Sequence, residues 1–301
     1  MKAKRKMNSR FAPYLFILPY FIGVLLFTAG PLVMSFIMSF FDWPVIGDPV
    51  FTGMGNYIEL FTKDSQFYDS MAITFKFSAI FVPLTIVLSL ALALLISRQL
   101  KGISLFRVVF YLPTVVSSVS ISIIWGWILN KEYGILNYML SLLGVSGPDW
   151  LNSRKWALVA LIIVSGWTVG TMMLVFYTAL KGISTEIYEA ARIDGSGEFR
   201  TFFQITLPLI SPTMQFNIVT SFISALQNLS LVMLLTKGGP MKSTYMYGLF
   251  VYNNAFQKSR LGYASASAWV MFVIILLLTS LIFKSSDRWV FNQVTSKEER
   301  R

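Results

Sequence analysis

Between two long apolar runs lies one polar stretch whose spacing is informative, Glu189-Ala-Ala-Arg-Ile-Asp-Gly-Ser-Gly-Glu-Phe-Arg-Thr-Phe-Phe-Gln-Ile-Thr-Leu-Pro208. Just before it, Ser184 is placed to cap a short helix, and carboxylates at Glu186 and Glu189 in the first turn suit the positive end of the helix dipole. Gly195 is expected to end this helix, because glycine adopts a positive φ without steric cost. The sequence therefore predicts a short helix followed by a sharp reversal of the chain.

A second short helix is expected after this reversal, opened by Ser196 and Glu198. Its apolar side chains recur at i, i+3, i+4 and i+7, a spacing that suits packing against neighbouring helices. They are Phe199, Phe202, Phe203 and Thr206. We expect Pro208 and Pro212 to break this helix. Residues 181–211 are therefore predicted to form a rigid helix-turn-helix, called loop 181–211 below.

The composition is that of a membrane protein. Of the 301 residues, 55% are hydrophobic and 13% are charged, and the mean hydropathy is +0.64. A soluble globular domain would be less apolar, so we expect a polytopic membrane protein.

The chain contains no Cys and no His. This excludes disulfides and Cys-ligated metals, and it removes the usual acid-base group at neutral pH, so we expect no catalytic residue and no metal site. The net charge of +11 comes from basic residues scattered at the ends of apolar segments rather than gathered on an aromatic-bearing face. Membrane lipid, not nucleic acid, is therefore the expected polar partner.

Six apolar segments are long enough to cross a bilayer, which needs about 20 residues. They cover about 12–40, 72–96, 108–129, 157–180, 212–236 and 264–283. We expect Pro19 and Pro31 to kink the first segment, and we expect 42–69 and 130–155 to be polar connections. The predicted fold class is all-α integral membrane.

The distribution of basic residues orients these spans. Of the 25 Lys and Arg residues, 16 share one side of the membrane with both termini, 8 lie in loops on the other side, and Lys76 lies within the second span. The positive-inside rule therefore makes both termini and loop 181–211 cytoplasmic. The expected parts are a cytoplasmic N-terminal segment at 1–11, a six-span domain at 12–283 and a cytoplasmic C-terminal tail at 284–301. The loop at 237–260 carries four basic and no acidic residues, against this trend.

The spacing within loop 181–211 resembles a family motif. A Glu-Ala-Ala start, Gly195, nine residues, Ile205, one residue and Leu207-Pro208 are similar to the loop by which permease subunits of bacterial ATP-binding-cassette importers dock on their ATPase. Other segments resemble the carbohydrate-uptake branch, especially the maltose-type first permease. They are Pro44 to Leu60, Tyr111-Leu-Pro113, Trp150-Leu, Leu235-Thr-Lys-Gly-Gly-Pro240 and Gly262-Tyr-Ala-Ser-Ala266. Family members often carry Pro where this chain has Ser184, a departure that keeps the helix cap.

The resemblance implies six transmembrane helices with a cytoplasmic coupling helix between the fourth and fifth, in the bacterial cytoplasmic (inner) membrane. It implies a second homologous permease subunit, two ATP-binding-cassette ATPase subunits and an extracytoplasmic sugar-binding protein as partners. The residues it assigns to ATPase coupling are Glu189, Ala190, Ala191, Arg192, Asp194 and Gly195. ATP and Mg belong to the ATPase subunits and no cofactor to this chain, which has no Gly-x-x-x-x-Gly-Lys-[Ser/Thr] phosphate loop.

Uncharged polar side chains within the spans are candidates for a translocation path, because they usually face a bundle interior or a water-filled cavity. In the fifth span Ser221, Ser224 and Asn228 recur at i, i+3 and i+7. By resemblance, positions near Thr171 and Asn228 contact the sugar. The predicted substrate path comprises Trp167, Thr171, Ser221, Ser224, Gln227 and Asn228. The alternative is that Ser and Thr side chains here bond their own backbone or join helices.

Two other classes of function compete with an importer permease. A secondary transporter or channel for a polar solute, if ion-coupled, typically has carboxylates or His within its spans, whereas the only charge clearly inside a span here is Lys76. A membrane-embedded enzyme needs His, Cys or paired acids at membrane depth. We therefore expect a permease that forms half of the path for a sugar or oligosaccharide, neutral or acidic.

Overall fold

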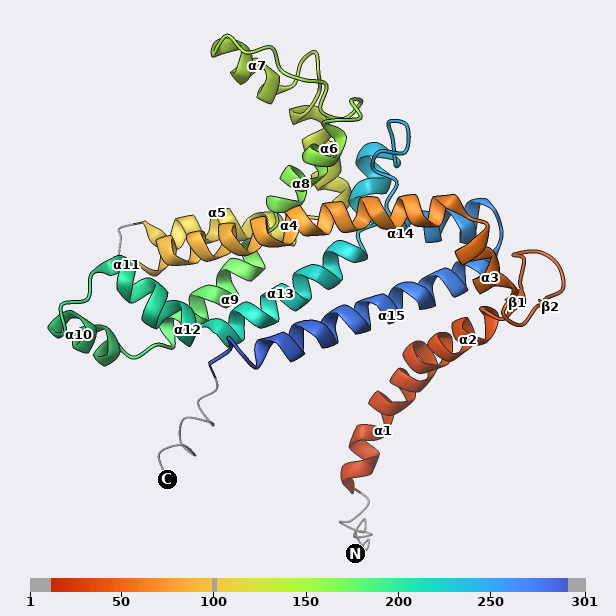
Figure 1. Cartoon of the computed structure of the whole chain (residues 1–301), viewed down its shortest axis with the longest axis horizontal. Coiled ribbons are helices and arrows are strands. Elements are labelled where there is room, and N and C mark those ends of the chain that lie inside the picture. Colours follow the sequence, from red (N-terminus) through yellow and green to blue (C-terminus); the bar gives the residue numbers. More distant parts are fainter. Residues whose placement is uncertain (1–11, 99–101, 292–301) are drawn as a thin grey trace, which may run out of the picture. The chain divides into compact units, whose positions relative to one another are not determined.

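The computed structural model describes residues 12–98 and 102–291 (Figure 1). The expected N-terminal segment at 1–11 and the end of the expected C-terminal tail, from residue 292, lie outside these residues. The chain divides into two compact units. Unit 1 comprises residues 1–64 and 251–272, and unit 2 comprises residues 65–250 and 273–301. Within the described parts the chain is mainly helical, as the sequence predicts.

Unit 1 begins with an apolar helical run that covers the expected first span. It consists of α1 (Ala12–Val24), the π-helical turn η1 (Leu25–Ala29) and α2 (Gly30–Met38). Pro19 lies inside α1 without breaking it. The irregularity expected at Pro31 takes the form of η1, where the Gly30 N–H donates to the carbonyl oxygen of Leu25. A proline has no N–H for the regular helical bond, so the preceding turn is the place where the helix widens.

The rest of unit 1 folds against the start of the last long helix. β1 (Phe41–Asp42) pairs antiparallel with β2 (Val50–Phe51), and α3 (Gly55–Thr62), the π-helical η4 (Asn253–Gln257) and the start of α15 (Leu261–Ser286) complete the unit. The Asn56 side chain donates to the carbonyl oxygens of Ser39 and Phe41, at 2.9 and 2.8 Å. Gly262 lies so close to β1 that a Cβ there would meet the Phe41 oxygen at 1.9 Å. The segment 42–69 was predicted as a polar connection, and that prediction did not include α3.

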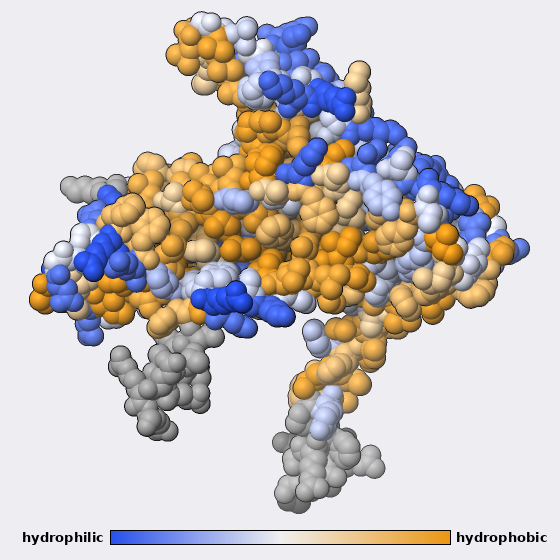
Figure 2. Space-filling model, viewed as in Figure 1, coloured by the Kyte–Doolittle hydropathy of each residue, from blue (hydrophilic) through white to orange (hydrophobic). Residues whose placement is uncertain are grey.

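Unit 2 is built around α4 (Ser65–Ser97), which packs against α9 (Gly170–Lys181) and α13 (Ser211–Leu226). Its buried hydroxyls donate to their own helix, as Thr74 does to the Ser70 oxygen at 2.7 Å and Ser78 to the Thr74 oxygen at 2.8 Å. These polar side chains are satisfied within one helix and need no water or cargo. Figure 2 shows hydrophilic residues around α10 (Thr185–Ile193) and α11 (Glu198–Thr201), beside helices with an apolar surface.

Two expected single spans are instead bent helix pairs, and a third bent pair joins the second part of loop 181–211 to the start of the expected fifth span. α5 (Ile103–Val115) and α6 (Ser118–Ile128) meet at 105°, α8 (Ala157–Gly166) and α9 at 46°, and the helical run 198–209 and α13 at 68°. The first bend follows from extended backbone at Val116 and Ser117, where the Ser117 hydroxyl accepts from the Ser120 N–H. Among the described residues, three helices are long and apolar enough to cross a membrane, or up to six spans exist if each bent pair counts as one.

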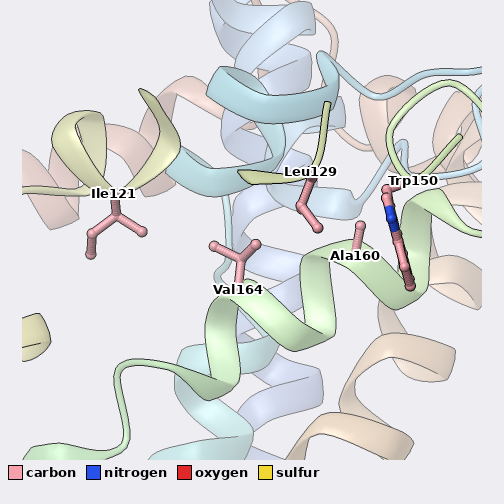
Figure 3. Packing of buried hydrophobic residues seen from close by; sticks show 5 residues of the cluster. All are labelled: Ile121, Leu129, Trp150, Ala160 and Val164. Atoms are coloured by element: carbon pink, nitrogen blue, oxygen red, sulfur yellow. The ribbon is translucent and has the colours of Figure 1, made fainter. Parts of the chain in front are cut away.

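A buried apolar cluster joins α6 and α8 in unit 2. Figure 3 shows its side chains, Ile121, Leu129, Trp150, Ala160 and Val164. The Trp150 indole N–H donates to Asn137 Oδ1 at 2.7 Å, which ties α7 (Ile135–Leu142) to this core. The connection at 130–155, predicted as polar, thus contains a helix, because its apolar side chains have a core to pack on.

The expected fifth span is also interrupted. α13 ends at Leu226, and the π-helical η3 (Val232–Thr236) follows after a break. Beyond it, the segment predicted as a loop at 237–260 contains α14 (Tyr247–Tyr252). The Tyr247 N–H donates to the buried hydroxyl of Thr74 at 2.8 Å, a contact 173 residues apart in sequence. This long-range contact fixes the start of α14.

Candidate functional site

The first helix of loop 181–211 begins and ends as the sequence predicts. Ser184 caps α10, and its hydroxyl accepts from the Glu186 N–H at 3.3 Å. Gly195 has a φ of +73°, its N–H donates to the Arg192 oxygen at 3.0 Å, and the next N–H, of Ser196, donates to the Ala191 oxygen at 2.9 Å. This pair of bonds with a left-handed residue is the Schellman arrangement that closes a helix.

Loop 181–211 presents most of its predicted coupling residues outward. Ala191 is buried at 6% exposure. Its neighbours Glu189, Ala190, Arg192, Asp194 and Gly195 are exposed. Glu189 lies in the second turn of α10, not in the first turn as expected, so only Glu186 lies close to the positive end of the helix dipole. The exposed charges are thus available to a protein partner.

The second helix of this loop differs from the prediction. α11 continues through the π-helical η2 (Phe202–Thr206) into α12 (Leu207–Leu209), so Pro208 lies within a helical run and does not end it. The predicted apolar stripe is not uniformly buried, because Phe199 is 79% and Phe203 48% exposed. Instead the Tyr188 and Thr206 hydroxyls, 3.2 Å apart, connect this run to α10.

Trp167 and Thr171 lie at the break between α8 and α9. Trp167 caps the end of α8 and is 38% exposed, and its ring meets the edge of Trp125 at a centroid distance of 5.8 Å. Thr171 is exposed in the first turn of α9. Both side chains therefore lie where the helical backbone changes direction.

The residues predicted on α13 separate into two groups. Ser221 is buried, and its hydroxyl donates to the Asn217 oxygen at 2.6 Å and approaches Met172 Sδ of α9 at 4.0 Å. Ser224 and Gln227 are exposed, whereas Asn228 is half-buried. The i, i+3, i+7 spacing fails at Asn228, because α13 ends at Leu226 and Asn228 follows in an irregular segment.

Four of the predicted path residues carry unsatisfied side chains. Within the described residues, no hydrogen bond reaches the side chains of Thr171, Ser224, Gln227 or Asn228. A polar side chain among apolar helices is costly without a partner. These side chains, together with Trp167, therefore have free donors and acceptors for water, cargo or another subunit.

Trp125 is a neighbour of this site that the sequence reasoning missed. Its indole N–H is buried and has no partner in the described part of the chain, although its ring packs on the cluster of Figure 3 and on Trp167. The signal available in the sequence was an aromatic residue within a serine-rich apolar segment, which does not distinguish Trp125 from Trp127.

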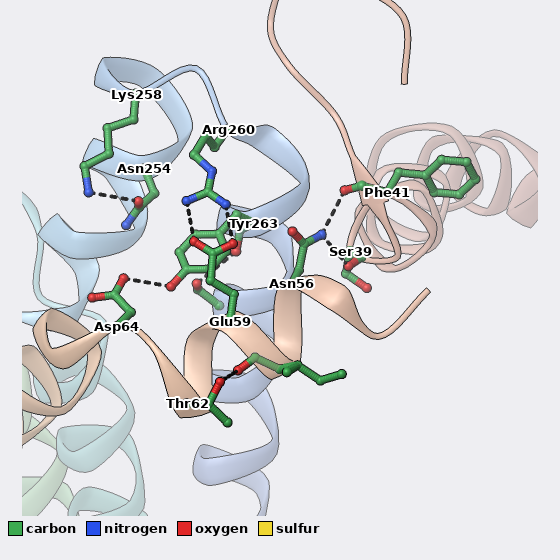
Figure 4. A network of polar contacts seen from close by, with 12 residues as sticks. Ser39, Phe41, Asn56, Glu59, Thr62, Asp64, Asn254, Lys258, Arg260 and Tyr263 are labelled. Atoms are coloured by element: carbon green, nitrogen blue, oxygen red, sulfur yellow. Dashed lines mark hydrogen bonds and ion pairs between the residues drawn. The ribbon is translucent and has the colours of Figure 1, made fainter. Parts of the chain in front are cut away.

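A separate polar cluster lies in unit 1 (Figure 4). Arg260 donates two hydrogen bonds to the Glu59 carboxylate, at 2.8 and 2.7 Å, and the Tyr263 hydroxyl donates to Asp64 at 2.7 Å. The Arg260 guanidinium lowers the pKa of Glu59 below its ordinary value. This pairing also accounts for one of the four basic residues at 237–260. In the described ranges, no group of three or more acidic residues could hold a metal ion.

Comparison with known proteins identifies the family. Residues 85–295 match the family described as "Binding-protein-dependent transport system inner membrane component". The chain is 36% identical to the "Probable ABC transporter permease protein YesP" of Bacillus subtilis (strain 168), over 99% of this chain and 97% of that protein. It is 32% identical to the "Trehalose/maltose transport system permease protein MalF" of Thermococcus litoralis, over 94% and 96%.

A solved structure shares the fold. It is a bacterial ABC transporter "involved in the import of the acidic polysaccharide alginate", with a TM-score of 0.80, 24% identity and coverage of 93% of this chain and 96% of that chain. The matched family and relatives confirm the predicted resemblance to importer permeases and the all-α membrane fold class. The coupling role of loop 181–211 stays a prediction. The chain belongs to the family of inner membrane components of binding-protein-dependent transport systems, the permeases of ATP-binding-cassette importers.

Proposed function

We propose that this permease forms half of the translocation path for a sugar or oligosaccharide in the bacterial cytoplasmic membrane. The names of relatives such as the trehalose/maltose permease support a sugar cargo. The second half comes from a homologous permease subunit, and an extracytoplasmic binding protein delivers the cargo. ATP is hydrolysed on two separate ATPase subunits, and both termini and loop 181–211 are cytoplasmic. The six-span domain extends over residues 12–283.

The observation that carries the proposal is the set of unsatisfied, uncharged side chains at helix breaks in unit 2. Trp167 offers a ring face, and Gln227 and Asn228 offer amide groups that no other described side chain engages. Sugar hydroxyls both donate and accept hydrogen bonds, and their ring faces stack on aromatic rings. The combination suits a neutral polyhydroxylated cargo. Ser221 is buried and its hydroxyl bonds within α13, so we assign it a structural role beside the path rather than a contact with cargo.

Coupling to the ATPase is assigned to α10 and its cap. Glu189, Arg192 and Asp194 are exposed, and the buried Ala191 and the turn at Gly195 hold them in place. Ala190, small and exposed between them, allows close approach of a partner surface. A helix held at both ends transmits a displacement better than a flexible loop does.

The test replaces Asn228 by Leu in the reconstituted importer. If the Asn228 amide bonds cargo, its loss leaves cargo hydroxyls unpaired at a cost of about 1–3 kcal/mol, which corresponds to about a 5- to 150-fold loss of uptake. ATP hydrolysis stimulated by the binding protein should persist in the same sample. Thr220→Val is the matched control, because the Thr220 hydroxyl already donates to the carbonyl oxygens of Phe216 and Asn217.

Three results would contradict the proposal. Normal uptake in Asn228→Leu removes this residue from the path, and reduced expression or assembly assigns it to helix packing instead. Uptake that proceeds without ATPase subunits would favour a secondary transporter or channel. Measuring uptake and ATP hydrolysis on one preparation separates these cases.

A further inference from the structure

A groove of about 1010 Å³ lies in unit 2 between the inner side of loop 181–211 and the ends of α4 and α9. Three basic side chains line it, Arg98 after α4, Lys181 at the end of α9, and Arg192 on α10. Hydroxyl groups of Ser97 and Thr185 lie among the same lining residues. The groove is distinct from the path residues at the helix breaks, none of which lines it.

The charge of this groove is not compensated. Glu198 is the one carboxylate among the lining residues. Within the described chain, the side chains of Arg98, Lys181 and Arg192 enter no hydrogen bond or ion pair. By contrast, the Arg260 side chain bonds Glu59 and the Arg200 side chain bonds Gln204. Cations held together without partners attract an anion with several acceptor oxygens, such as a phosphate group.

The other wall of the groove is apolar. Phe199, Phe202 and Phe203 line it with Leu94 and Leu180. The rings of Phe199 and Phe203 are 4.7 Å apart between centroids, and those of Phe202 and Phe203 are 4.9 Å apart. Phe199 is exposed although it is aromatic, so this wall is open to an apolar ligand. A free phosphate would leave it uncovered, whereas an acyl chain would cover it.

The position of the groove agrees with a lipid. It lies at the end of α4, which is long and apolar enough to cross a membrane, and at the end of α9, which belongs to a bent helix pair that passes the same test. If both cross the membrane, their ends lie near the boundary between hydrocarbon and water. The basic-residue count places this end in the cytoplasm, where the membrane leaflet carries anionic lipids. We propose that the groove binds one anionic phospholipid, with its phosphate among Arg98, Lys181 and Arg192 and an acyl chain along the three phenylalanines.

Such a lipid would act on the coupling helix from its inner side. Thr185, Tyr188 and Arg192 line the groove at i, i+3 and i+7 of α10, whereas Glu189 does not line it. The two faces of α10 therefore have different partners, lipid on one and ATPase on the other. A bound lipid would brace α10 and engage Arg192, while Glu189 and Asp194, which do not line the groove, stay available to the ATPase.

The test uses the full-length chain with the subunits that co-purify with it. The complex is placed in nanodiscs of phosphatidylcholine with a graded fraction of phosphatidylglycerol, and retained lipid is counted by native mass spectrometry after extraction. One phosphatidylglycerol per permease should be retained in preference to phosphatidylcholine. Arg98→Gln and Lys181→Gln should each weaken retention about five-fold, since a cation near an anionic surface contributes about that factor. Phe203→Ala should also weaken retention.

Lys284→Gln is the matched control, because Lys284 is exposed in the last turn of α15 and does not line the groove. The proposal would be overturned if Lys284→Gln weakened lipid retention as much as Arg98→Gln and Lys181→Gln do, because retention would then reflect only the overall surface charge. Equal retention of phosphatidylglycerol and phosphatidylcholine would also overturn it. Displacement of the lipid by inorganic phosphate would show a free-anion site instead. Retention by the isolated chain but not by the complex would show that a partner subunit fills the groove. None of these measurements needs a sugar, so their outcome is independent of the proposed cargo.

Discussion

Gly195 is the position where one added methyl group should uncouple the permease from its ATPase. Its φ of +73° lies in the left-handed region, and the cap of α10 depends on that conformation. A Cβ built there meets no atom within 4 Å, so crowding adds nothing to the cost of Gly195→Ala. The remaining penalty is that of the backbone conformation, about 1–2 kcal/mol.

This penalty falls on the turn that holds Arg192 and Asp194. A cost of about 1–2 kcal/mol shifts the local equilibrium toward a frayed turn by about 5- to 30-fold. Affinity for the ATPase should fall by up to the same factor, because binding must restore the turn. Membrane insertion should be unchanged, since the apolar helices are not altered.

The assay titrates purified ATPase subunits onto the permease in nanodiscs. Gly197→Ala is the matched control, because Gly197 has a φ of −70° and its Cβ would also meet no atom within 4 Å. Gly195→Asn should recover most of the affinity, since asparagine tolerates the left-handed region. Equal affinities for Gly195→Ala and Gly197→Ala would refute the argument.

Three further predictions concern other parts of the chain. A reporter active only outside the cell should be silent after Gln204 and active after Lys242, and the reverse pattern would overturn the orientation. Glu59→Gln should cost unit 1 about 1 kcal/mol or less at pH 7, because the ion pair with Arg260 is partly exposed. Folding lowers the pKa of Glu59, so the ion pair stabilises the fold at pH values above the ordinary pKa of 4.5. The difference in stability between Glu59→Gln and the parent, measured by limited proteolysis, should therefore shrink as the pH falls below 4.5. Trp125→Phe should keep the thermal stability of the detergent-solubilised permease, because it removes an indole N–H that has no partner among the described residues. Trp125→Ala should cost about 3 kcal/mol, because it opens a cavity beside Trp167. Equal melting temperatures of the two variants would contradict this prediction.

Features governed by neighbouring residues could be predicted from the sequence. The Ser184 cap and the positive φ of Gly195 depend on side-chain and backbone chemistry within a few positions. The apolar segments that form α2 and α15 could likewise be predicted, because length and hydropathy decide whether a helix can cross a bilayer. The coupling residues could be proposed for the same reason, since their spacing lies within one short loop, and their role stays a prediction.

Features governed by distant contacts could not be predicted. α14 begins where the Tyr247 N–H meets Thr74, and no local signal indicates that contact. Gly170, which follows the bend between α8 and α9, lies so close to α5 that a Cβ there would clash with the Phe110 oxygen, and no local signal indicates this packing. The spacing argument for Asn228 failed because it assumed an unbroken helix, although hydropathy alone does not show where a span is interrupted.

The interruptions themselves carry functional meaning. Backbone groups that leave a helix at membrane depth need other partners, so broken helices persist there only when protein buries the break or when it borders a water-filled cavity. In unit 2 the break after Gly166 exposes Trp167, and the break after Leu226 exposes Gln227. An amide such as that of Gln227 would be costly to expose to lipid. We therefore propose that these breaks face a water-filled path or a second subunit, and a two-permease importer would provide both.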